Sequence, residues 1–482
     1  MRAVYEIFTW PWLTGLAQRL GRPVTLGDMP GEVWDEVAAS GLDAVWLMGV
    51  WERSPAGLEV ATGNEGLQRA FREALPDYTP ADLVGSPYCV RRYRADERLG
   101  GPAGLAAARA ELSARGLKLI LDYVPNHVAP DHPAVFAHPG WFVQGTREDL
   151  EADPAGWFAA DGKVIAHGKD PYFPAWPDVA QVNAFTPGLR GATAEALIDI
   201  GDQCDGIRCD MAMLLTNEIF ARTWGRQVGP APAGEFWPAV LGRVRQRHPD
   251  LVLIAEVYWD MEWTLQQQGF DLCYDKRLYD RLVHEDAGSV RKHLVAGLDY
   301  QERLLRFIEN HDEPRAAAAL PGGRGRAAAV AVATLPGTTL WHDGQFDGAR
   351  VRLPVFLGRS PEASPDPQLH SFYSRLIEAA SRVRRGQWTL LEPGGWPDNP
   401  THQDVLAWSW RDGPGRHVVA VNFADHDSQA RIALPWDDLG AREWRLTDLI
   451  DGRVFDRDGR DLADSGLFVA LPPWGHHVFS FT

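Results

Sequence analysis

The chain is predicted to be an α/β protein: a closed eight-stranded (β/α)8 (TIM) barrel with an inserted subdomain after strand three and a C-terminal β-sandwich domain. Over its first two-thirds, short apolar runs alternate with amphipathic helical patterns, which is typical of parallel strands joined by helices. Eight of these runs qualify as strands, which is the number that closes such a barrel. In the last third, short runs of alternating apolar and polar residues, separated by turns, replace this pattern and indicate an all-β domain.

The expected strands are short, and several are apolar throughout, as strands buried on both faces should be. They are Ala3–Phe8, Ala44–Val50, Leu117–Val124, Gly206–Asp210, Leu251–Glu256, Leu272–Tyr274, Leu304–Ile308 and Gly337–Trp341. Helical patterns are found at Val33–Ser40, Leu105–Arg115, Ala192–Gly201, Phe236–Arg247 and Leu369–Arg385. In a barrel of this kind the active site lies at the carboxyl ends of the strands.

Two segments depart from the barrel pattern. Residues 126–190 are rich in Pro, Gly, Asp and Trp and are too long for a plain loop, so they are expected to form the inserted subdomain. The barrel is then residues 1–125 and 191–386, and the β-sandwich is residues 387–482. Strands of the β-sandwich are expected at Val405–Trp410, His417–Asn422, Ala430–Leu434, Leu467–Leu471 and His477–Phe481.

The composition fits a soluble globular protein: of 482 residues, 45% are hydrophobic and 10% aromatic. The net charge of −17 argues against nucleic acid or an anionic membrane as a partner. It fits an enzyme with a neutral substrate, although solubility explains it equally well. The four Cys residues lack metal-type spacing, and no signal peptide or membrane span is seen, so a cytoplasmic protein with reduced, buried thiols is expected.

The stretch Asp205–Leu215 (DGIRCDMAMLL) contains a predicted buried strand. The last residue of this strand is a carboxylate, Asp210. Burying an unpaired Asp costs roughly several kcal/mol. Arg208 lies two residues earlier, on the same face of a strand, where it can pair with Asp210 and keep it ionised. A purely structural ion pair explains this stretch equally well when it is considered alone.

Acidic and imidazole groups also stand at the ends of other predicted strands: Asp122 and His127 in DYVPNH, Glu256 in AEVYW, and His311 and Asp312 in FIENHD. Singly, each is explained by a solvated loop or a turn. Together, three carboxylates at one rim suit retaining glycoside hydrolysis, which needs one ionised and one protonated carboxyl group about 5–5.5 Å apart. Close like charges raise the pKa of one partner, which supplies the acid. The imidazoles can hydrogen-bond sugar hydroxyls.

These segments resemble the signature segments of the α-amylase family (glycoside hydrolase family 13). DYVPNH, GIRCD, AEVYW and FIENHD match four of them in order, and WPDVAQVN resembles a fifth in the inserted subdomain. The resemblance implies a retaining enzyme for α-glucosidic bonds in α-glucans or maltooligosaccharides. It assigns Asp210 as the nucleophile, Glu256 as the general acid/base and Asp312 as the carboxylate that stabilises the transition state.

The resemblance also implies several substrate contacts. His127 and His311 would contact the sugar, and Tyr88 would be a platform beneath it. Arg208 would hold Asp210. Asp122 and Asn126 would shape the rim of the site. Three Trp residues fall at or just past strand ends, where stacking on glucose and core packing are both open: Trp51, Trp259 and Trp341. Of these, Trp259 is assigned to substrate binding.

Two departures from the family pattern concern the substrate and metal sites. Met213 and Leu214 replace a common Lys-His pair that contacts substrate and supplies a calcium ligand, and Cys89 replaces an Asp that often follows Tyr88. No metal ligand is therefore assigned and no cofactor is required; calcium is possible but not supported. Alternatives are a glucanotransferase, a trehalose-forming isomerase or a phosphorylase using the same nucleophile, and a non-catalytic sugar-binding relative. Linkage, endo or exo action and oligomeric state stay open.

Overall fold

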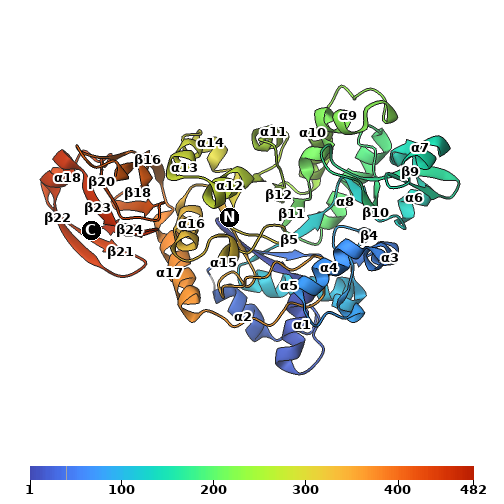
Figure 1. The fold of residues 1–482 in the computed structure, drawn as a ribbon, viewed down its shortest axis with the longest axis horizontal. Coiled ribbons are helices and arrows are strands. Elements are labelled where there is room, and N and C mark those ends of the chain that lie inside the picture. The colour runs from blue at the N-terminus through green and yellow to red at the C-terminus, as the bar shows by residue number, and fades with distance from the viewer. Residues whose placement is uncertain (40) are drawn as a thin grey trace. The chain divides into compact units, whose positions relative to one another are not determined.

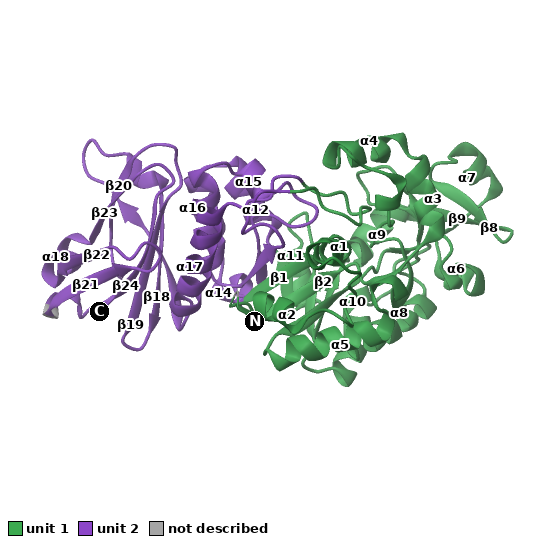
Figure 2. Cartoon of the chain, turned by 90° about the horizontal axis from the view of Figure 1, so that it is seen from below, with its two compact units in different colours: residues 1, 3–274, 352–362 green, residues 2, 275–351, 363–482 purple. Residues whose placement is uncertain are grey.

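The computed structural model describes residues 1–39 and 41–482; Ser40, the last residue of one expected helix, lies outside the described residues. The chain forms two compact units (Figure 2). The first contains Met1, Ala3–Tyr274 and Arg352–Glu362. The second contains Arg2, Asp275–Val351 and Ala363–Thr482.

Eight strands close into a barrel in the order β1-β15-β14-β13-β12-β11-β5-β2, which follows their order along the chain. The strands are β1 (Ala3–Phe8), β2 (Ala44–Met48), β5 (Lys118–Tyr123), β11 (Gly206–Cys209), β12 (Val252–Ala255), β13 (Leu272–Tyr274), β14 (Leu304–Arg306) and β15 (Thr338–His342). The pairs β1–β2, β2–β5, β5–β11, β11–β12, β12–β13 and β14–β15 are parallel. The predicted barrel is confirmed, and each expected strand overlaps one of these eight.

The barrel strands are buried along nearly their whole length. Every residue of β2 and β11 is buried, and in β5 only Lys118 is exposed. Continuous burial is what parallel strands acquire when side chains fill the barrel and helices cover its outside. The apolar runs in the sequence therefore located these strands well, and a charged residue within one of them, such as Arg208, stands out.

Outside residues 126–186, the described residues of the first unit form nine α-helices. They are α1 (Thr9–Leu20), α2 (Gly31–Ala39), α3 (Pro55–Gly63), α4 (Glu65–Ala74), α5 (Gly101–Ala114), α8 (Pro187–Gly201), α9 (Asn217–Trp224), α10 (Phe236–Arg247) and α11 (Glu262–Gln267). Of these, α1, α5 and α8 pack on the barrel strands that lie next to them in the sequence. In Figure 1, α8 and α10 lie side by side. The four helices expected in this unit match α2, α5, α8 and α10.

The segment between β5 and α8 forms a small antiparallel sheet, in the order β6-β10-β9-β7 with β8 on β9. Its elements are β6 (His127–Val128), α6 (Pro133–Ala137), β7 (Gln144–Gly145), α7 (Arg147–Ala152), β8 (Trp157–Ala160), β9 (Lys163–Gly168) and β10 (Trp176–Gln181). A hairpin of β3 (Trp51–Arg53) and β4 (Val90–Ala95) also belongs to this unit. The exact domain boundaries 126 and 190 remain predictions.

The second unit contains β14 and β15, together with six helices between β13 and the C-terminal sheets. The helices are α12 (Lys276–His284), α13 (Ala287–Leu294), α14 (Leu298–Gln301), α15 (Ala316–Ala319), α16 (Gly323–Thr334) and α17 (Pro367–Val383). Of these, α12 packs on β14. Helix α16 is buried along most of its length, since all residues from Ala327 to Thr334 are buried. The expected helix at 369–385 corresponds to α17.

The C-terminal part of the second unit consists of two antiparallel sheets around a common apolar core, which confirms the predicted β-sandwich. The larger sheet has the order β16 (Gln387–Leu391), β18 (Val405–Asp412), β19 (Gly415–Asn422), β24 (His476–Phe481), β21 (Glu443–Asp448) and β22 (Val454–Asp458). The smaller one has the order β17 (Pro393–Gly394), β20 (Ser428–Ile432) and β23 (Leu467–Leu471), and helix α18 (Gly459–Ser465) follows β22. Each of the five expected strands overlaps one of these.

Two further expectations concern the state of the cysteines and the presence of a membrane-spanning helix. Cys89, Cys204, Cys209 and Cys273 are all free and buried, as predicted. Within residues 1–39 and 41–482, no helix is both long and apolar enough to cross a membrane.

Candidate active site

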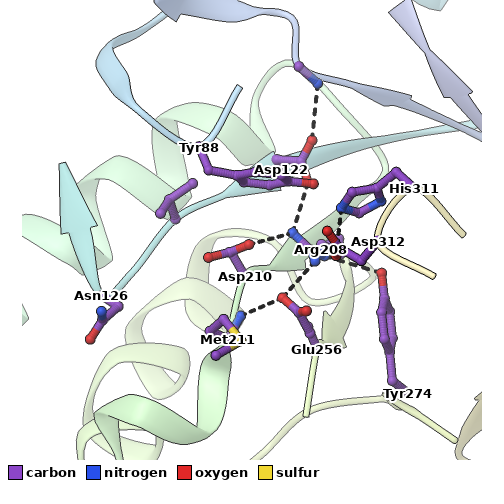
Figure 3. A network of polar contacts seen from close by, with 12 residues as sticks. Tyr88, Asp122, Asn126, Arg208, Asp210, Met211, Glu256, Tyr274, His311 and Asp312 are labelled. Atoms are coloured by element: carbon purple, nitrogen blue, oxygen red, sulfur yellow. Dashed lines mark hydrogen bonds and ion pairs between the residues drawn. The ribbon is translucent and has the colours of Figure 1, made fainter. Parts of the chain in front are cut away.

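Arg208 is the centre of a buried polar network at the carboxyl ends of β5, β11 and β12 (Figure 3). Its Nη1 donates to Oδ1 of Asp210 at 2.9 Å and to Oδ1 of Asp122 at 3.4 Å. Its Nη2 donates to Oε2 of Glu256 at 2.6 Å, and its Nε donates to the hydroxyl of Tyr274 at 3.3 Å. One guanidinium thus binds three carboxylates from three adjacent strands.

Arg208 remains charged although it is fully buried. Burial acts to lower the pKa of Arg208, but Glu256 and the other nearby acidic groups outweigh it, so this pKa lies well above its usual value. The rings of Trp46, Tyr88 and Tyr274 also surround the guanidinium, with centroids 5.1, 5.3 and 5.6 Å from its Cζ. Desolvated cation–π contacts of this kind are worth up to about 2 kcal/mol each.

Three hydrogen bonds hold the carboxylate of Glu256. It directly follows β12 and is buried. In addition to the contact with Arg208, its Oε2 accepts the backbone N–H of Met211 at 2.8 Å, and its Oε1 accepts the hydroxyl of Tyr258 at 2.6 Å. Met211, the residue after Asp210, has φ of 42°, a left-handed conformation that is costly for a side chain other than Gly. Its strained backbone therefore joins the Asp210 segment to Glu256.

Backbone hydrogen bonds fix the segments that carry Asp210 and Glu256 next to each other. The N–H of Asp210 donates to the carbonyl of Tyr123 at 2.8 Å, which continues the ladder between β5 and β11. The N–H of Glu256 donates to the carbonyl of Cys209 at 3.0 Å, and the N–H of Ala212 donates to the carbonyl of Glu256 at 2.9 Å. The two carboxylates therefore sit on one rigid section of barrel wall.

Asp122 is held by donors from β2 and the loop that follows it. It is 2% exposed, and its Oδ2 accepts Nε1 of Trp46 at 3.2 Å and the backbone N–H of Gly49 at 3.3 Å. These contacts orient it toward Arg208. Its predicted contact with substrate remains a prediction, and the structure gives it a clear role in positioning Arg208.

The residues after β5 connect the barrel to the inserted sheet. His127 lies in β6 and is buried, and burial lowers the pKa of His127 to about 4, so its imidazole is neutral near pH 7. Asn126 and Gln181 exchange side-chain hydrogen bonds at 3.3 and 3.0 Å. Because Gln181 ends β10, this amide pair ties the segment WPDVAQ to the barrel.

The structure separates the three Trp residues that the sequence left open. Trp51 and Trp341 are 1% exposed, so both are core residues. Trp259 is partly exposed, has φ of 64° and packs edge-on against Tyr172 of the inserted subdomain, with ring centroids 4.9 Å apart. Trp259 does not contact Arg208 directly, and its role in substrate binding remains a prediction.

In the second unit, the loop after β14 carries the other predicted site residues. His311 is buried, while the Asp312 side chain is 42% exposed, and Nε2 of His311 lies 2.9 Å from Oδ2 of Asp312 (Figure 3). Oδ1 of Asn310 accepts the backbone N–H groups of Asp312 and Glu313, each at 2.9 Å, which fixes the turn. The loop thus presents Asp312 toward solvent on a defined backbone.

Sequence reasoning missed a buried cluster behind this loop. Glu309 is fully buried; its Oε2 accepts the backbone N–H of Ala316 at 2.6 Å, and its Oε1 forms an ion pair with Nε of Arg315 at 3.1 Å. Nδ1 of His342 lies 3.4 Å from the same oxygen and accepts a hydrogen bond from Nη1 of Arg315 at 2.6 Å. Burial raises the pKa of Glu309 to about 7, against the opposing effect of Arg315. The carboxylate of Glu309 inside the signature segment FIENHD was the available signal, but one of its neighbours, His342, lies on β15.

Metal ligation was the last open question about the site. Among the residues that the structure describes, no group of three or more His, Cys, Asp or Glu side chains is arranged to hold a metal ion. The side chain of Asn126 is engaged with Gln181. The expectation about calcium stays a prediction.

No protein-family model matches the chain. It is similar to the α-amylase MalA of Haloarcula japonica, with 25% identity over 331 residues that cover 66% of this chain and 43% of that protein. It is also similar to the α-1,4-glucan:maltose-1-phosphate maltosyltransferase of Burkholderia pseudomallei, with 23% identity over 452 residues that cover 86% of this chain and 34% of that protein. The chain therefore spans less than half the length of these two relatives.

Among solved structures, the maltogenic α-amylase AmyB of Thermotoga neapolitana matches with a TM-score of 0.69 and 17% identity, covering 100% of this chain and 98% of that one. This likeness concerns the fold. Fold and strand-end carboxylates together define a (β/α)8-barrel protein with an acidic site at its carboxyl rim. The sequence similarity to the α-amylase MalA confirms the more specific resemblance to the α-amylase family that the signature segments indicated.

Proposed function

We propose that the chain is a retaining enzyme that cleaves α-glucosidic bonds in α-glucans or maltooligosaccharides. The observation that carries the proposal is that Asp210 and Glu256 bind different terminal nitrogens of one guanidinium, that of Arg208. This holds two carboxyl groups together at the ends of neighbouring strands, as a double displacement requires. The names of the curated relatives, an α-amylase and an α-1,4-glucan maltosyltransferase, support the substrate class.

In the proposed reaction, Asp210 attacks the anomeric carbon while protonated Glu256 gives its proton to the glycosidic oxygen. The bond between the sugar and its leaving group breaks, and a covalent glycosyl-enzyme forms on Asp210. Glu256, now ionised, takes a proton from water, which attacks the anomeric carbon and releases Asp210. The permanently charged Arg208 favours the ionised form of Asp210 that both steps need.

Asp312 is proposed to complete the site. All strands of a closed parallel barrel point their carboxyl ends to one rim, and β14 is one of the eight. Asp312 follows β14 and is partly exposed, so its carboxylate is available to bind ring hydroxyls and stabilise the oxocarbenium-like transition state. The proposed sugar contacts are His127, His311, Tyr88 and Trp259. Because the imidazole of His127 is neutral near pH 7, it can both donate and accept a hydrogen bond.

A second proposal keeps the glycosyl-enzyme but passes the sugar to another acceptor, as in a glucanotransferase, a trehalose-forming isomerase or a phosphorylase. The similarity to a maltosyltransferase favours it. A non-catalytic sugar-binding relative is disfavoured, because all three proposed carboxylates are present. Neither reaction requires a cofactor, and the four free thiols suit a reducing, cytoplasmic compartment.

The proposal is tested with maltoheptaose and the purified protein. Proton NMR during the first turnovers should show products with the α-anomeric configuration, and Asp210→Asn should retain no more than roughly one-thousandth of the wild-type kcat. Asp199→Asn, at an exposed position of α8, is the matched control and should keep full activity. A product ladder longer than the substrate indicates transfer, and shorter sugars alone indicate hydrolysis. Inverted products, or an Asp210→Asn variant with a tenth of the activity, would refute the mechanism.

A further inference from the structure

A four-residue turn in the first unit, Ser86-Pro87-Tyr88-Cys89, carries the proposed sugar contact Tyr88. Ser86, Pro87 and Cys89 are buried, whereas Tyr88 is partly exposed. The carbonyl of Ser86 accepts the backbone N–H of Cys89 at 3.3 Å, and Oγ of Ser86 accepts the N–H of Tyr88 at 3.1 Å. Pro87 restricts φ at the second position, as is common in such turns. These features fix the shape of the turn but not its place on the barrel.

The place of this turn decides where the ring of Tyr88 lies. The ring centroid is 5.3 Å from Cζ of Arg208, whose guanidinium also binds Asp210 and Glu256 (Figure 3). The backbone of Tyr88 hydrogen-bonds the imidazole of His127, which is a second proposed sugar contact. A small shift of the turn would therefore move two sugar contacts relative to the proposed catalytic carboxylates.

Arg53, in β3, attaches the turn to the barrel. Its Nη1 donates to the carbonyl of Gly85, directly before the turn, at 2.5 Å, and its Nη2 donates to the carbonyl of Gly49 at 3.5 Å. Gly49 follows β2, and its N–H holds Asp122 of the buried polar network. A Cβ at Gly49 would lie 2.9 Å from both Nη2 of Arg53 and Cβ of Pro87, so the barrel, the guanidinium and the turn meet at this glycine.

Arg53 is a costly residue at this position. It is 5% exposed, and among the described residues its guanidinium donates to two backbone carbonyls and to no carboxylate. Burial lowers the pKa of Arg53 to about 9; the charge of Arg98 acts in the same direction, and that of Asp96 opposes them. Arg53 is therefore still charged near pH 7, between the rings of Trp10 and Phe8, whose centroids lie 5.2 and 6.0 Å from its Cζ. A buried charge that binds only carbonyls and rings is a poor choice for stability alone.

The other end of the turn is held by the inserted subdomain. Sγ of Cys89 donates to the carbonyl of Asp178, in β10, at 2.9 Å. A Cβ at Gly57 of α3 would clash with this Sγ, so the thiol fills the space that the glycine leaves. Cys89 thus fixes one end of the turn, and Arg53 fixes the end at Gly85.

We propose that Arg53 is a positioning residue, which holds the turn at the carbonyl of Gly85 so that the ring of Tyr88 lies beneath the sugar attacked by Asp210. This role of Arg53 rests on the proposed function, which makes Tyr88 a sugar contact and Asp210 the nucleophile. Arg53 touches no reacting atom and acts through Tyr88. Its planar fork of N–H donors can bind the carbonyls of Gly49 and Gly85 at once, which the compact ammonium of a Lys on a flexible stem does less well.

A double-mutant cycle tests whether Arg53 acts through Tyr88. With maltoheptaose as the substrate, Arg53→Ala should lower kcat/KM roughly tenfold, and Tyr88→Ala should lower it at least as much. In the Tyr88→Ala background, Arg53→Ala should lower kcat/KM by less than about twofold, because the ring that Arg53 positions is already absent.

Arg98→Ala is the matched control for Arg53→Ala. The guanidinium of Arg98 also lies over the ring of Trp10, with its Cζ 4.5 Å from the centroid, but its side chain is 56% exposed and pairs with Asp96. Since Arg98 donates to neither carbonyl that Arg53 binds, Arg98→Ala should keep kcat/KM within about twofold of the wild type.

A second measurement does not depend on turnover. In protein labelled with 3-fluorotyrosine, fluorine NMR should give a signal for Tyr88, which is assigned by its loss in Tyr88→Phe. This signal should shift and broaden in Arg53→Lys, where a carbonyl loses its donor, and it should be unchanged in Arg98→Ala. If Arg53→Ala does not fold, Arg53→Lys takes its place in the cycle and should lower kcat/KM by roughly threefold or more.

The possible outcomes are distinct. If the wild type does not turn over maltoheptaose, the proposed function fails, and the fluorine signal alone decides whether Arg53 holds the turn. If the wild type is active and the Arg53 substitution lowers kcat/KM by the same factor with and without the Tyr88 ring, the positioning role fails while the proposed function stands. An Arg53→Lys variant with wild-type kcat/KM and an unchanged Tyr88 signal would also overturn this role.

Discussion

At the scale of single residues, the contacts of Arg208 offset the cost of burying three carboxylates. Each buried carboxylate costs several kcal/mol, approximately, unless it is paired and hydrogen-bonded. Arg208 contacts Asp122, Asp210 and Glu256 together, and backbone N–H groups or ring donors satisfy the remaining oxygens of Asp122 and Glu256. This arrangement is a weak choice for stability alone, and so it argues for a site retained for chemistry.

Glu309 gives a prediction about pH at the same scale. Its pKa is raised from 4.5 to about 7 in the folded chain, so the folded state favours its protonated form. Protonated Glu309 therefore contributes to the free energy of unfolding. This contribution is fully present below about pH 4.5 and is lost as the pH rises through 7. The charged and titratable groups around it are Arg315, His342, Tyr279 and Tyr373.

Glu309→Gln should remove this pH dependence. The free energy of unfolding of the wild type should decline relative to the variant, by on the order of 1–3 kcal/mol, between pH 4.5 and pH 8. Urea unfolding at several pH values in this interval measures the difference, and Glu362→Gln, on an exposed loop, is the control. Parallel stability curves for the wild type and Glu309→Gln would contradict the raised pKa.

Site residues with an informative local sequence were predicted, whereas contacts between residues far apart in the chain were missed. Asp210 and Glu256 stand directly after apolar strands, and Arg208 is two residues from Asp210, so local patterns predicted them. Trp46 and Tyr274, which flank Arg208, contact it only because the barrel closes. The contact of Glu309 with His342 likewise depends on β15 lying next to β14.

At the scale of elements, all eight barrel strands were predicted, but several helices were not, among them the twelve-residue helices α1 and α16. Helix α1 was missed because Pro11 suggests a break, yet Pro11 lies in the first turn, where backbone N–H groups have no helical partner. The hairpin β21–β22 was missed because β22 alternates exposed and half-buried residues and has no apolar run. Helices of four residues, such as α15, are too short to show a period.

The inserted sheet offers a prediction at this scale. Gln181 is fully buried and its amide makes hydrogen bonds to Asn126, Val182 and Lys169. Gln181→Leu would leave several of these polar groups buried without partners, at about 1–3 kcal/mol each. The variant should unfold at lower denaturant concentration, and it should also have a raised KM, because His127 pairs with β10 in the same sheet.

The matched control for this variant is Gln144→Leu. The Gln144 side chain also hydrogen-bonds a backbone carbonyl, that of Pro139, but it is exposed to solvent. Its replacement should change stability by less than about 0.5 kcal/mol. If Gln181→Leu is as stable as Gln144→Leu, the amide pair does not anchor the inserted sheet.

At the scale of the whole molecule, the barrel and the β-sandwich were predictable from their patterns of apolar residues. The insert was predictable because its composition and length interrupt the barrel pattern. The chain folds as two compact units, and the residues of the predicted barrel are divided between them. No local pattern predicts this division, since it depends on packing between elements far apart in sequence. Asp210 and Glu256 belong to the first unit and Asp312 to the second.

The central claim is that Asp210 forms a covalent bond to the sugar. It is tested most directly by trapping that intermediate with 5-fluoro-α-glucosyl fluoride in a Glu256→Gln variant, where hydrolysis of the glycosyl-enzyme is slowed. Peptide mass spectrometry should find the sugar on the peptide that contains Asp210, with fragmentation assigning it to that side chain. A label on Asp312 or Asp122, or no label from an enzyme that still releases fluoride, would contradict the account.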